Sequence, residues 1–104
     1  MKDVKLFQSA QIRSIWNDEA GEWFFSVVDV VGALTDSADK SAYWRKLKQR
    51  MKAEGNETVT NCHRLKLLAE DGKMRLTDTA NTEGILRIIQ SIPSPKAEPF
   101  KQWL

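Results

Sequence analysis

Apolar and polar residues alternate along the first 25 positions in the manner of β-strands. β-Formers dominate residues 4–7 and 11–16, and in the second stretch Ile12, Ser14 and Trp16 occupy every other position. Residues 17–21, with the sequence NDEAG, predict a turn. The aromatic run at residues 23–25 then predicts the return strand of a β-hairpin.

From residue 26 the apolar spacing changes to that of a helix. The positions i, i+1, i+4 and i+7 are filled by Val27, Val28, Val31 and Leu34. Valine is a mediocre helix former, so a strand is an alternative here, but Asp29 and the small residues Gly32 and Ala33 favour a buried helix. We therefore predict a helix that opens at Ser26 or Val27, ended by residues 35–37, which also offer N-caps for a following helix.

The next segment predicts a longer helix over residues 39–54, with Gly55 as its left-handed terminator. One face of this helix is apolar and should pack on the core: Tyr43, Trp44, Leu47 and Met51. Together with the preceding helix, this segment has the outline of a helix-turn-helix pair, which is shared by many DNA readers. Helical hairpins that bind nothing have the same outline.

Six Lys or Arg residues and no carboxylate lie between Lys40 and Ala53. A stripe at i, i+3, i+4 and i+7 combines long cations with an amide, and two further cations flank it: Arg45, Lys48, Gln49 and Lys52, then Lys46 and Arg50. These side-chain types reach phosphates and purine edges. Like charges at this spacing destabilise a helix, and a bound polyanion is one way to offset that cost. A solvated basic face is the alternative.

Residues 56–61 predict a loop or a short edge strand. Beyond them, Asp71-Gly72 is the strongest hairpin signal in the chain and joins strands expected at residues 64–69 and 73–77. We expect one apolar face (Leu65, Leu67, Met74 and Leu76) and one positive face (Arg64 or Lys66 with Lys73 and Arg75). The cations of such a ribbon either contact a nucleic-acid backbone or protect the sheet edge from aggregation.

Asp78 is expected to cap a third helix that extends to about Ser91. Its apolar stripe indicates a scaffold element: Ile85, Ile88, Ile89 and Ile92. A last helix begins either behind Ser94 and Pro95 or at Pro99, with Ala97, Phe100 and Leu104 on one face. No terminating residue follows, so we expect residues 1–92 to form the domain and residues 93–104 to begin a helix that continues in a longer protein.

Composition narrows the class of protein. A chain of 104 residues, 29% of them charged, allows one modest core and excludes a disordered chain. No apolar run approaches the roughly 20 residues of a membrane span and no signal peptide is present, so we expect a cytoplasmic protein without a membrane partner. Residues 1–36 carry three cations against six carboxylates, a net charge of −3, and the rest of the chain carries +5. Such a polarised surface could meet phosphate on one side.

The residues of catalysis and metal binding are sparse. One cysteine and one histidine, Cys62 and His63, cannot form a disulfide framework or a zinc site. They could form a nucleophile pair, but adjacent residues of an extended chain point to opposite faces. There is no glycine-rich phosphate loop, and no close pair of carboxylates lies in an apolar setting. We therefore expect no enzyme activity, no cofactor and no metal.

Several short motifs, taken in their order along the chain, resemble one known family. They are Ile12-Arg13, the EWFF strand at residues 22–25, the D-V-x-x-x-L pattern within residues 28–34, the DGK and LTD steps at residues 71–73 and 76–78, and the QSIPSPKAEPFKQWL ending. Together they resemble the N-terminal domain of the BRO family, found in prophage antirepressors and related viral proteins.

This resemblance implies a compact α+β domain that binds DNA and controls lysogeny through DNA or through a repressor protein. Many family members have a Gly-Tyr step followed by Asn-Pro after the first helix, whereas this chain has TDSAD at residues 35–39. The resemblance supplies no catalytic residue.

We therefore predict a small single α+β domain with two β-hairpins and about four helices, including a helix-turn-helix-like pair. The predicted function is non-enzymatic binding of double-stranded DNA in phage or prophage gene regulation. The predicted contacts are Arg45, Lys46, Lys48, Gln49, Arg50, Lys52, Lys66, Lys73 and Arg75. The alternative is a protein-interaction module that binds and inactivates a phage repressor. The oligomeric state is left open by the sequence.

Overall fold

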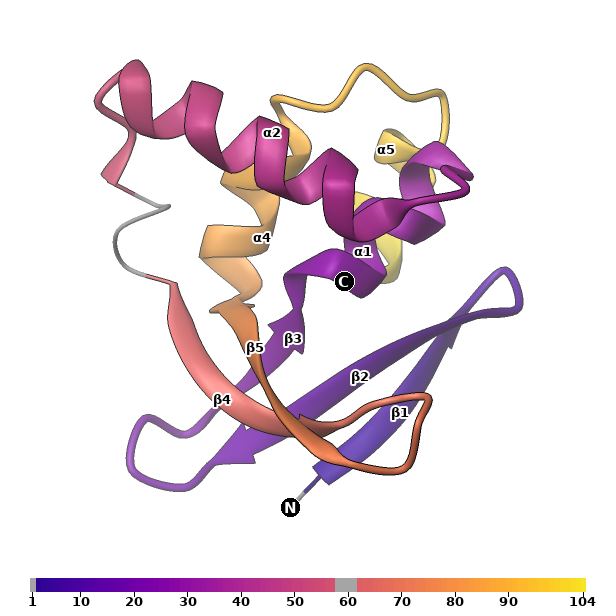
Figure 1. The fold of residues 1–104 in the computed structure, drawn as a ribbon, viewed down its shortest axis with the longest axis vertical. Helices are drawn as coiled ribbons and strands as arrows, with labels where there is room; N and C mark the ends of the chain where they lie inside the picture. The colour runs from indigo at the N-terminus through magenta and orange to yellow at the C-terminus, as the bar shows by residue number, and fades with distance from the viewer. Residues whose placement is uncertain (1, 58–61) are drawn as a thin grey trace.

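The computed structural model describes residues 2–57 and 62–104 of the chain (Figure 1). Five strands and four helices lie within these two ranges. Their order is β1 (Lys2–Phe7), β2 (Ala10–Asn17), β3 (Glu22–Ser26), α1 (Val27–Thr35), α2 (Lys40–Ala53), β4 (His63–Leu68), β5 (Met74–Asn81), α4 (Thr82–Ile89) and α5 (Ala97–Trp103). The α+β class predicted from the sequence is confirmed.

All five strands form one antiparallel sheet in the order β1-β2-β3-β5-β4. The hairpin predicted across residues 17–21 is the β2–β3 pair. A further hairpin joins β1 to β2 through Gln8 and Ser9, which have φ values of 49° and 75°. Two consecutive residues in the left-handed region match the tight turns that suit the twist of a hairpin. Neither residue is glycine, so the sequence contains no glycine signal that would predict this turn.

The sheet coils so that its two ends approach each other. Figure 1 shows the β4–β5 hairpin passing in front of β2 and β1. The guanidinium Nη1 of Arg13 on β2 donates to the carbonyl oxygen of Leu68 at the end of β4, at 3.0 Å. These two strands are not neighbours in the sheet order. Leu67, on the inner face of the hairpin, is only 2% exposed because of this closure.

The main core lies between the other face of the sheet and the helices. The sheet contributes Phe7, Ile12, Phe25 and Ala80, and α1 contributes an almost continuous apolar segment. From α4 come Ile85, Ile88 and Ile89, as the isoleucine stripe predicts. Helix α5 places Phe100 in the same core, with its ring 4.8 Å from that of Phe7, edge to face.

The two helices that the apolar pattern predicted have the expected bounds. At the start of α1 the Ser26 hydroxyl accepts from the Asp29 amide at 3.4 Å, and after its end Asp36 adopts the left-handed region at φ 53°. The cap of α2 is Asp39 and not one of residues 35–37 as expected, because the Asp39 carboxylate accepts from the Ala42 amide at 3.0 Å. Gly55 follows the helix with φ 76°, as predicted. The valines of α1 are helical because the helix is buried, which outweighs their weak intrinsic preference.

The expected start of the third helix is wrong. Asp78 lies within β5, which continues to Asn81, and α4 begins at Thr82. Asn81 is the actual N-cap, because its Oδ1 accepts from the Gly84 amide at 2.9 Å. Both Asp and Asn are good caps. The choice was decided by pairing of β5 with β3, which keeps residues 79–81 extended.

The last helix begins at neither of the two expected positions but at Ala97. Ser94 is close to a capping role: its hydroxyl accepts from the Lys96 amide at 3.1 Å and donates to the carbonyl oxygen of Leu34. Pro99 lies in the first turn, where a missing N–H group costs no helical hydrogen bond. Residues 58–61, part of the segment expected as a loop or edge strand, lie outside the described residues.

Candidate nucleic-acid interface

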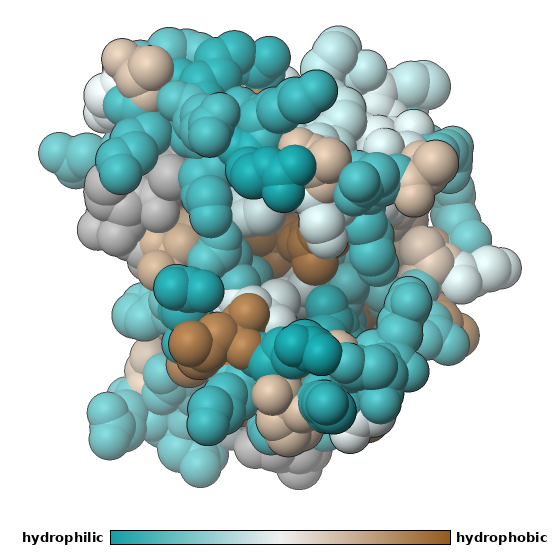
Figure 2. Space-filling model, in the orientation of Figure 1, coloured by the Kyte–Doolittle hydropathy of each residue, from teal (hydrophilic) through white to brown (hydrophobic). Residues whose placement is uncertain are grey.

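Helix α2 presents its apolar side to the core and its cations to solvent. Trp44, Leu47 and Met51 are buried, as predicted, and Tyr43 packs against them half-buried. The exposed side chains on the opposite side include Arg45, Lys46, Gln49 and Lys52. Hydrophilic side chains cover this region of the molecule in Figure 2.

Three of the predicted cations and the predicted amide have no partner among the residues that the structure describes. Across residues 2–57 and 62–104, no hydrogen bond or ion pair involves the side chain of Arg45, Lys46, Gln49 or Lys52. Their positive charges are therefore not compensated by a neighbouring carboxylate. An exposed, unpaired cation keeps its charge available for an external anion such as a phosphate.

Lys48, the fourth cation of the predicted set, is held by a carboxylate from β5. Its Nζ lies 2.8 Å from Oδ2 of Asp78, and the same oxygen accepts from the indole Nε1 of Trp44 at 2.9 Å. Arg64 on β4 lies beside the other oxygen, with 3.7 Å between its Nε and Oδ1. This cluster, the Asp78 cluster, joins α2 to the base of the β4–β5 hairpin.

The Asp78 carboxyl is ionised at neutral pH. Burial alone would raise its pKa, but the hydrogen bonds from Lys48 and Trp44, together with the charges of Lys48 and Arg64, outweigh burial. The pKa of Asp78 therefore lies below its ordinary value. A charged carboxylate in this position neutralises part of the positive field between the helix and the hairpin.

Arg50 points toward the other side of α2. Its Nη2 donates to the carbonyl oxygen of Ser91 at 3.1 Å, and its Nε lies 3.8 Å from a carboxylate oxygen of Glu54. These contacts direct the guanidinium toward the segment that follows α4. Arg50 is thus separated from the stripe that contains Arg45, Gln49 and Lys52, as its flanking position on the helix predicts.

The expected division of the hairpin into an apolar face and a positive face is wrong. Leu67 is paired with Arg75, and Lys66 with Leu76. Directly paired residues of an antiparallel ladder lie on the same face of the sheet. Each face therefore mixes apolar and cationic side chains. The face that carries Asp78, which looks toward α2, also carries Arg64, Lys66, Leu68, Met74 and Leu76.

The turn explains this one-residue shift. A two-residue loop at Asp71-Gly72 would have paired Leu67 with Leu76 and produced the expected faces. Instead the Ala69 amide donates to the Lys73 carbonyl at 2.9 Å, which leaves a three-residue loop closed by Gly72 at φ 82°. Loops of three residues with a left-handed third residue are the next most common hairpin connection. A shift of one residue exchanges the two faces of a strand.

The cations of the hairpin differ in how they are paired. Lys66 and Lys73 are exposed, and neither side chain forms a hydrogen bond or an ion pair within the described residues. Arg75 instead forms an ion pair with Asp71 in the turn, through both its Nε and its Nη2. The hydrogen bond from Arg75 lowers the pKa of Asp71 below its ordinary value. Lys66 and Lys73 are therefore the more available of the predicted hairpin cations.

The base of the hairpin and α2 lie on one side of the molecule, because Asp78 contacts both. In Figure 2 the surface is recessed between the hydrophilic side chains over α2 and those over the hairpin, where apolar side chains also reach the surface. The exposed apolar residues of the hairpin are Leu68, Met74 and Leu76. Thus Lys48 of α2 and Arg64 of the hairpin meet at Asp78, with an apolar patch on the hairpin side.

A buried ion-pair network joins β2, α1 and the start of α2, and the sequence did not predict it. Asp29 of α1 is 4% exposed and accepts from Arg13 through the backbone N at 3.0 Å, Nε at 2.7 Å and Nη2 at 3.1 Å. The Asp29 carboxylate also accepts from Nζ of Lys40, the first residue of α2, at 3.2 Å. Burial raises the pKa of Asp29, but the bonds and charges of Arg13 and the charge of Lys40 lower it overall.

The network lies beside an open groove of about 1070 Å³ between the β1–β2 hairpin, the start of α2 and the β4–β5 turn. Both signs of charge line this groove, and its apolar lining includes Val4, Leu67 and Met74. The cations near its floor, Arg13 and Lys40, already face Asp29. The groove thus differs from the exposed face of α2, where Arg45, Lys46 and Lys52 have no partner in the described ranges.

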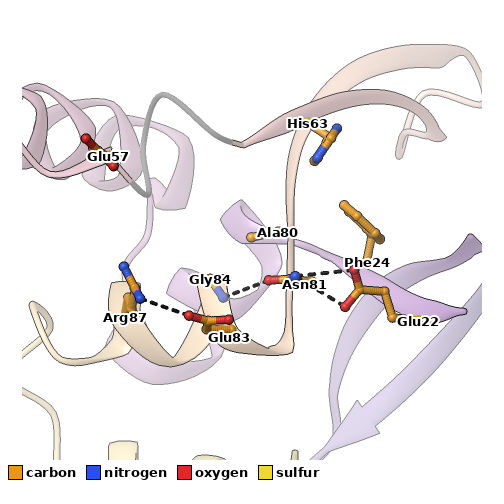
Figure 3. A pocket seen from close by; sticks show the side chains of 9 residues that line it. All are labelled: Glu22, Phe24, Glu57, His63, Ala80, Asn81, Glu83, Gly84 and Arg87. Atoms are coloured by element: carbon orange, nitrogen blue, oxygen red, sulfur yellow. Dashed lines mark hydrogen bonds and ion pairs between the residues drawn. The ribbon is translucent and has the colours of Figure 1, made fainter. Parts of the chain in front are cut away.

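A smaller pocket of about 330 Å³ lies at the start of α4 (Figure 3). The Asn81 amide nitrogen donates to both Glu22 carboxylate oxygens, at 3.2 and 3.4 Å, and Arg87 is bound to Glu83 at 2.8 Å. His63 packs edge-on against Phe24, with ring centroids 4.9 Å apart. The pairs drawn in Figure 3 bind one another, so this pocket has the character of a structural junction.

The neighbouring cysteine does not support a nucleophile. Burial, with a contribution from Asp78, raises the pKa of the Cys62 thiol to about 11. A thiol with that pKa is protonated at neutral pH, and the thiolate is the nucleophilic form.

In the described part of the chain no group of three or more His, Cys, Asp or Glu side chains could hold a metal ion. None of the described helices is long and apolar enough to cross a membrane.

These features define the class: a small α+β domain that carries a basic helix joined through Asp78 to a cationic β-hairpin. The family model of the BRO family, N-terminal domain, matches residues 11–104, nearly the whole chain. The chain therefore belongs to the BRO family. No curated protein and no solved structure gave a match.

Proposed function

We propose that this domain binds double-stranded DNA in phage or prophage gene regulation, without catalysing a reaction. The observation that carries the proposal is the exposed face of α2, where Arg45, Lys46 and Lys52 have no compensating carboxylate in the described chain. Three uncompensated cations on one short helix repel one another and attract a polyanion. Membership of the BRO family supports the same function.

The proposed contacts divide by their chemistry. Arg45, Lys46 and Lys52 bind backbone phosphates from α2, and Lys66 and Lys73 bind backbone phosphates from the hairpin. Gln49 lies among the cations of α2 and has the amide that pairs with the edge of adenine in the major groove. Lys48 and Arg75 have carboxylate partners in the free protein, and Arg50 binds a carbonyl oxygen on the other side of α2.

Salt dependence tests the proposal. Fluorescence anisotropy would measure the affinity for a generic duplex of about two helical turns between 50 and 300 mM salt. If Arg45, Lys46, Lys52, Lys66 and Lys73 each neutralise one phosphate, log affinity falls with log salt at a slope of about −4.5, from about −0.9 per contact. The triple variant R45A/K46A/K52A leaves Lys66 and Lys73 and should flatten the slope to about −1.8.

The control removes the same charge elsewhere. The variant R87A/K96A/K101A loses three cations from α4, α5 and the segment between them, and should keep a slope near that of the wild type. Absence of binding at 50 mM salt would contradict the proposal. Equal losses in the two triple variants would also contradict it, because they would show that net charge alone governs binding.

A second candidate function has one observation in its favour, the apolar patch of Leu68, Met74 and Leu76 on the hairpin. Exposed apolar patches with a polar rim are typical of protein-binding surfaces. We propose, as the alternative, that the patch binds a phage repressor. The double variant M74S/L76S should then abolish binding to the repressor and leave DNA affinity unchanged, whereas R45A/K46A/K52A should do the reverse.

A further inference from the structure

The Asp78 cluster places a carboxylate where the proposed interface would receive a phosphate. Asp78 is at the centre of a set of donors: the Lys48 ammonium at 2.8 Å, the Trp44 indole N–H at 2.9 Å and the Arg64 guanidinium at 3.7 Å. Its side chain is 13% exposed, whereas that of Lys48 is 39% exposed and that of Arg64 is 67% exposed. The cations can therefore turn toward solvent while the carboxylate stays in place.

The chemistry of this carboxylate matches that of a DNA phosphate. Both present negatively charged oxygens that accept charge-assisted hydrogen bonds from Lys and Arg. The remaining hydrogen bond, from the indole of Trp44, does not depend on either cation, because Trp44 is a buried residue of the core face of α2. Asp78 thus keeps one partner if Lys48 and Arg64 leave, so releasing them does not strand an unsatisfied buried group.

We propose that Asp78 is an internal competitor of DNA, which holds Lys48 and Arg64 in the free protein and yields them to backbone phosphates on binding. This inference rests on the proposed DNA-binding function and concerns the regulation of that same surface. Each contact that Lys48 or Arg64 makes with DNA is offset by the loss of its contact with Asp78. Asp78 therefore lowers affinity for DNA, and Lys48 contributes little net binding while Asp78 is charged.

A double-mutant cycle between Asp78 and Lys48 tests the inference. Asp78→Asn removes the charge and keeps an oxygen that can accept from the Trp44 indole. With a slope of about −0.9 per contact, one phosphate contact raises affinity about eightfold when salt falls tenfold, from 1 M to 0.1 M. We expect D78N to bind a generic duplex about eightfold more tightly than the wild type. Lys48→Ala should change wild-type affinity less than twofold but remove most of the gain in D78N.

A matched control separates this coupling from the general effect of net charge. Glu83→Gln also removes one carboxylate, from an exposed residue of α4, and should change affinity less than twofold. If D78N binds no more tightly than the wild type, the competitor role is wrong. It is also wrong if K48A/D78N keeps the full gain, because the gain would then not pass through Lys48.

The design distinguishes the two proposals. If the wild type does not bind duplex at 50 mM salt, the proposed function fails and the inference fails with it. If the wild type binds with the expected salt slope but the cycle shows no coupling, the inference alone fails. Circular dichroism of each variant checks the fold, and Asp78→Ser, a second uncharged acceptor, replaces D78N should the Asn variant not fold.

Discussion

Asp29 should be a principal determinant of stability, and Asp29→Asn is the variant that tests this. The carboxylate joins three elements, because it accepts from Arg13 on β2 and from Lys40 at the start of α2 while it belongs to α1. Arg13 in turn donates to the Leu68 carbonyl and so fixes the end of β4. Asn has nearly the same shape as Asp, but it brings an NH₂ group toward two cations and loses the negative charge.

The size of the effect follows from burial. The side chain of Asp29 is 3% exposed and that of Arg13 is 24% exposed. Removal of one partner from a buried ion pair costs about 3–5 kcal/mol, and the partial exposure of Arg13 favours the lower end, about 3 kcal/mol. The Lys40 pair adds little, because Lys40 is 40% exposed and water screens it. For a domain of this size, about 3 kcal/mol lowers Tm by about 12 °C.

Urea denaturation followed by tryptophan fluorescence and circular dichroism would measure the loss. The control is Asp36→Asn, which removes an exposed ion pair with Lys96 and leaves Asn in the left-handed conformation that it tolerates. We expect the control to cost at most about 1 kcal/mol. If D29N unfolds within about 0.5 kcal/mol of the wild type, the network does not stabilise the fold in the way its geometry suggests.

Two further predictions concern acid and the last helix. The pKa values of Asp29 and Asp78 lie below their ordinary values in the folded protein, so both groups contribute stability above a pH of about 4. That contribution is lost as pH falls through their folded-state pKa values. Urea midpoints measured from pH 6 to pH 3 should therefore fall steeply below pH 4, and less steeply in D29N. Phe100→Ala should cost about 3–5 kcal/mol, because the ring is fully buried and packs edge-on against Phe7; a urea midpoint near that of the wild type would mean that α5 is not part of the cooperative core.

Local signals predicted those parts of the fold that depend on local chemistry. The end of α2 follows from the left-handed Gly55, which is visible in the sequence, whereas the cap at its start is Asp39 and not one of residues 35–37 as expected. The turn at residues 17–21 and the return strand after it are equally local. The buried side of α2 was also predictable, because a helix has one fixed period wherever it packs.

The hairpin faces could not be predicted in the same way. Whether Asp71-Gly72 is the whole loop or the end of a three-residue loop determines which residues pair, and the same dipeptide suits both. The end of β5 posed a similar problem. Asp78 and Asn81 are both good caps, and only pairing with β3, a strand more than 50 residues earlier in the chain, selects Asn81.

The candidate interface depends even more on distant residues. Six cations of α2 can be counted in the sequence, but the carboxylates that compensate some of them come from elsewhere in the chain. Asp29 lies against Lys40, and Asp78 lies against Lys48 across a separation of 30 residues. Sequence spacing cannot reveal such pairs, so the nine predicted contacts did not divide into paired and unpaired groups until the tertiary structure brought the acids into place.

The position of the compensated cation on α2 bears on why the helix is stable without DNA. Lys48 is three residues after Arg45 and four before Lys52, so it takes part in both close repulsions of the stripe. Asp78 neutralises Lys48 and so reduces its repulsion with both Arg45 and Lys52. The helix therefore has less need of a bound polyanion to fold. The same compensation supports the competitor role of Asp78, because a charge that stabilises the free helix must be displaced before Lys48 can bind a phosphate. Loss of Asp78 should therefore destabilise the free domain slightly while it strengthens DNA binding, two opposite changes that neither a purely structural carboxylate nor a simple change in net charge would produce together.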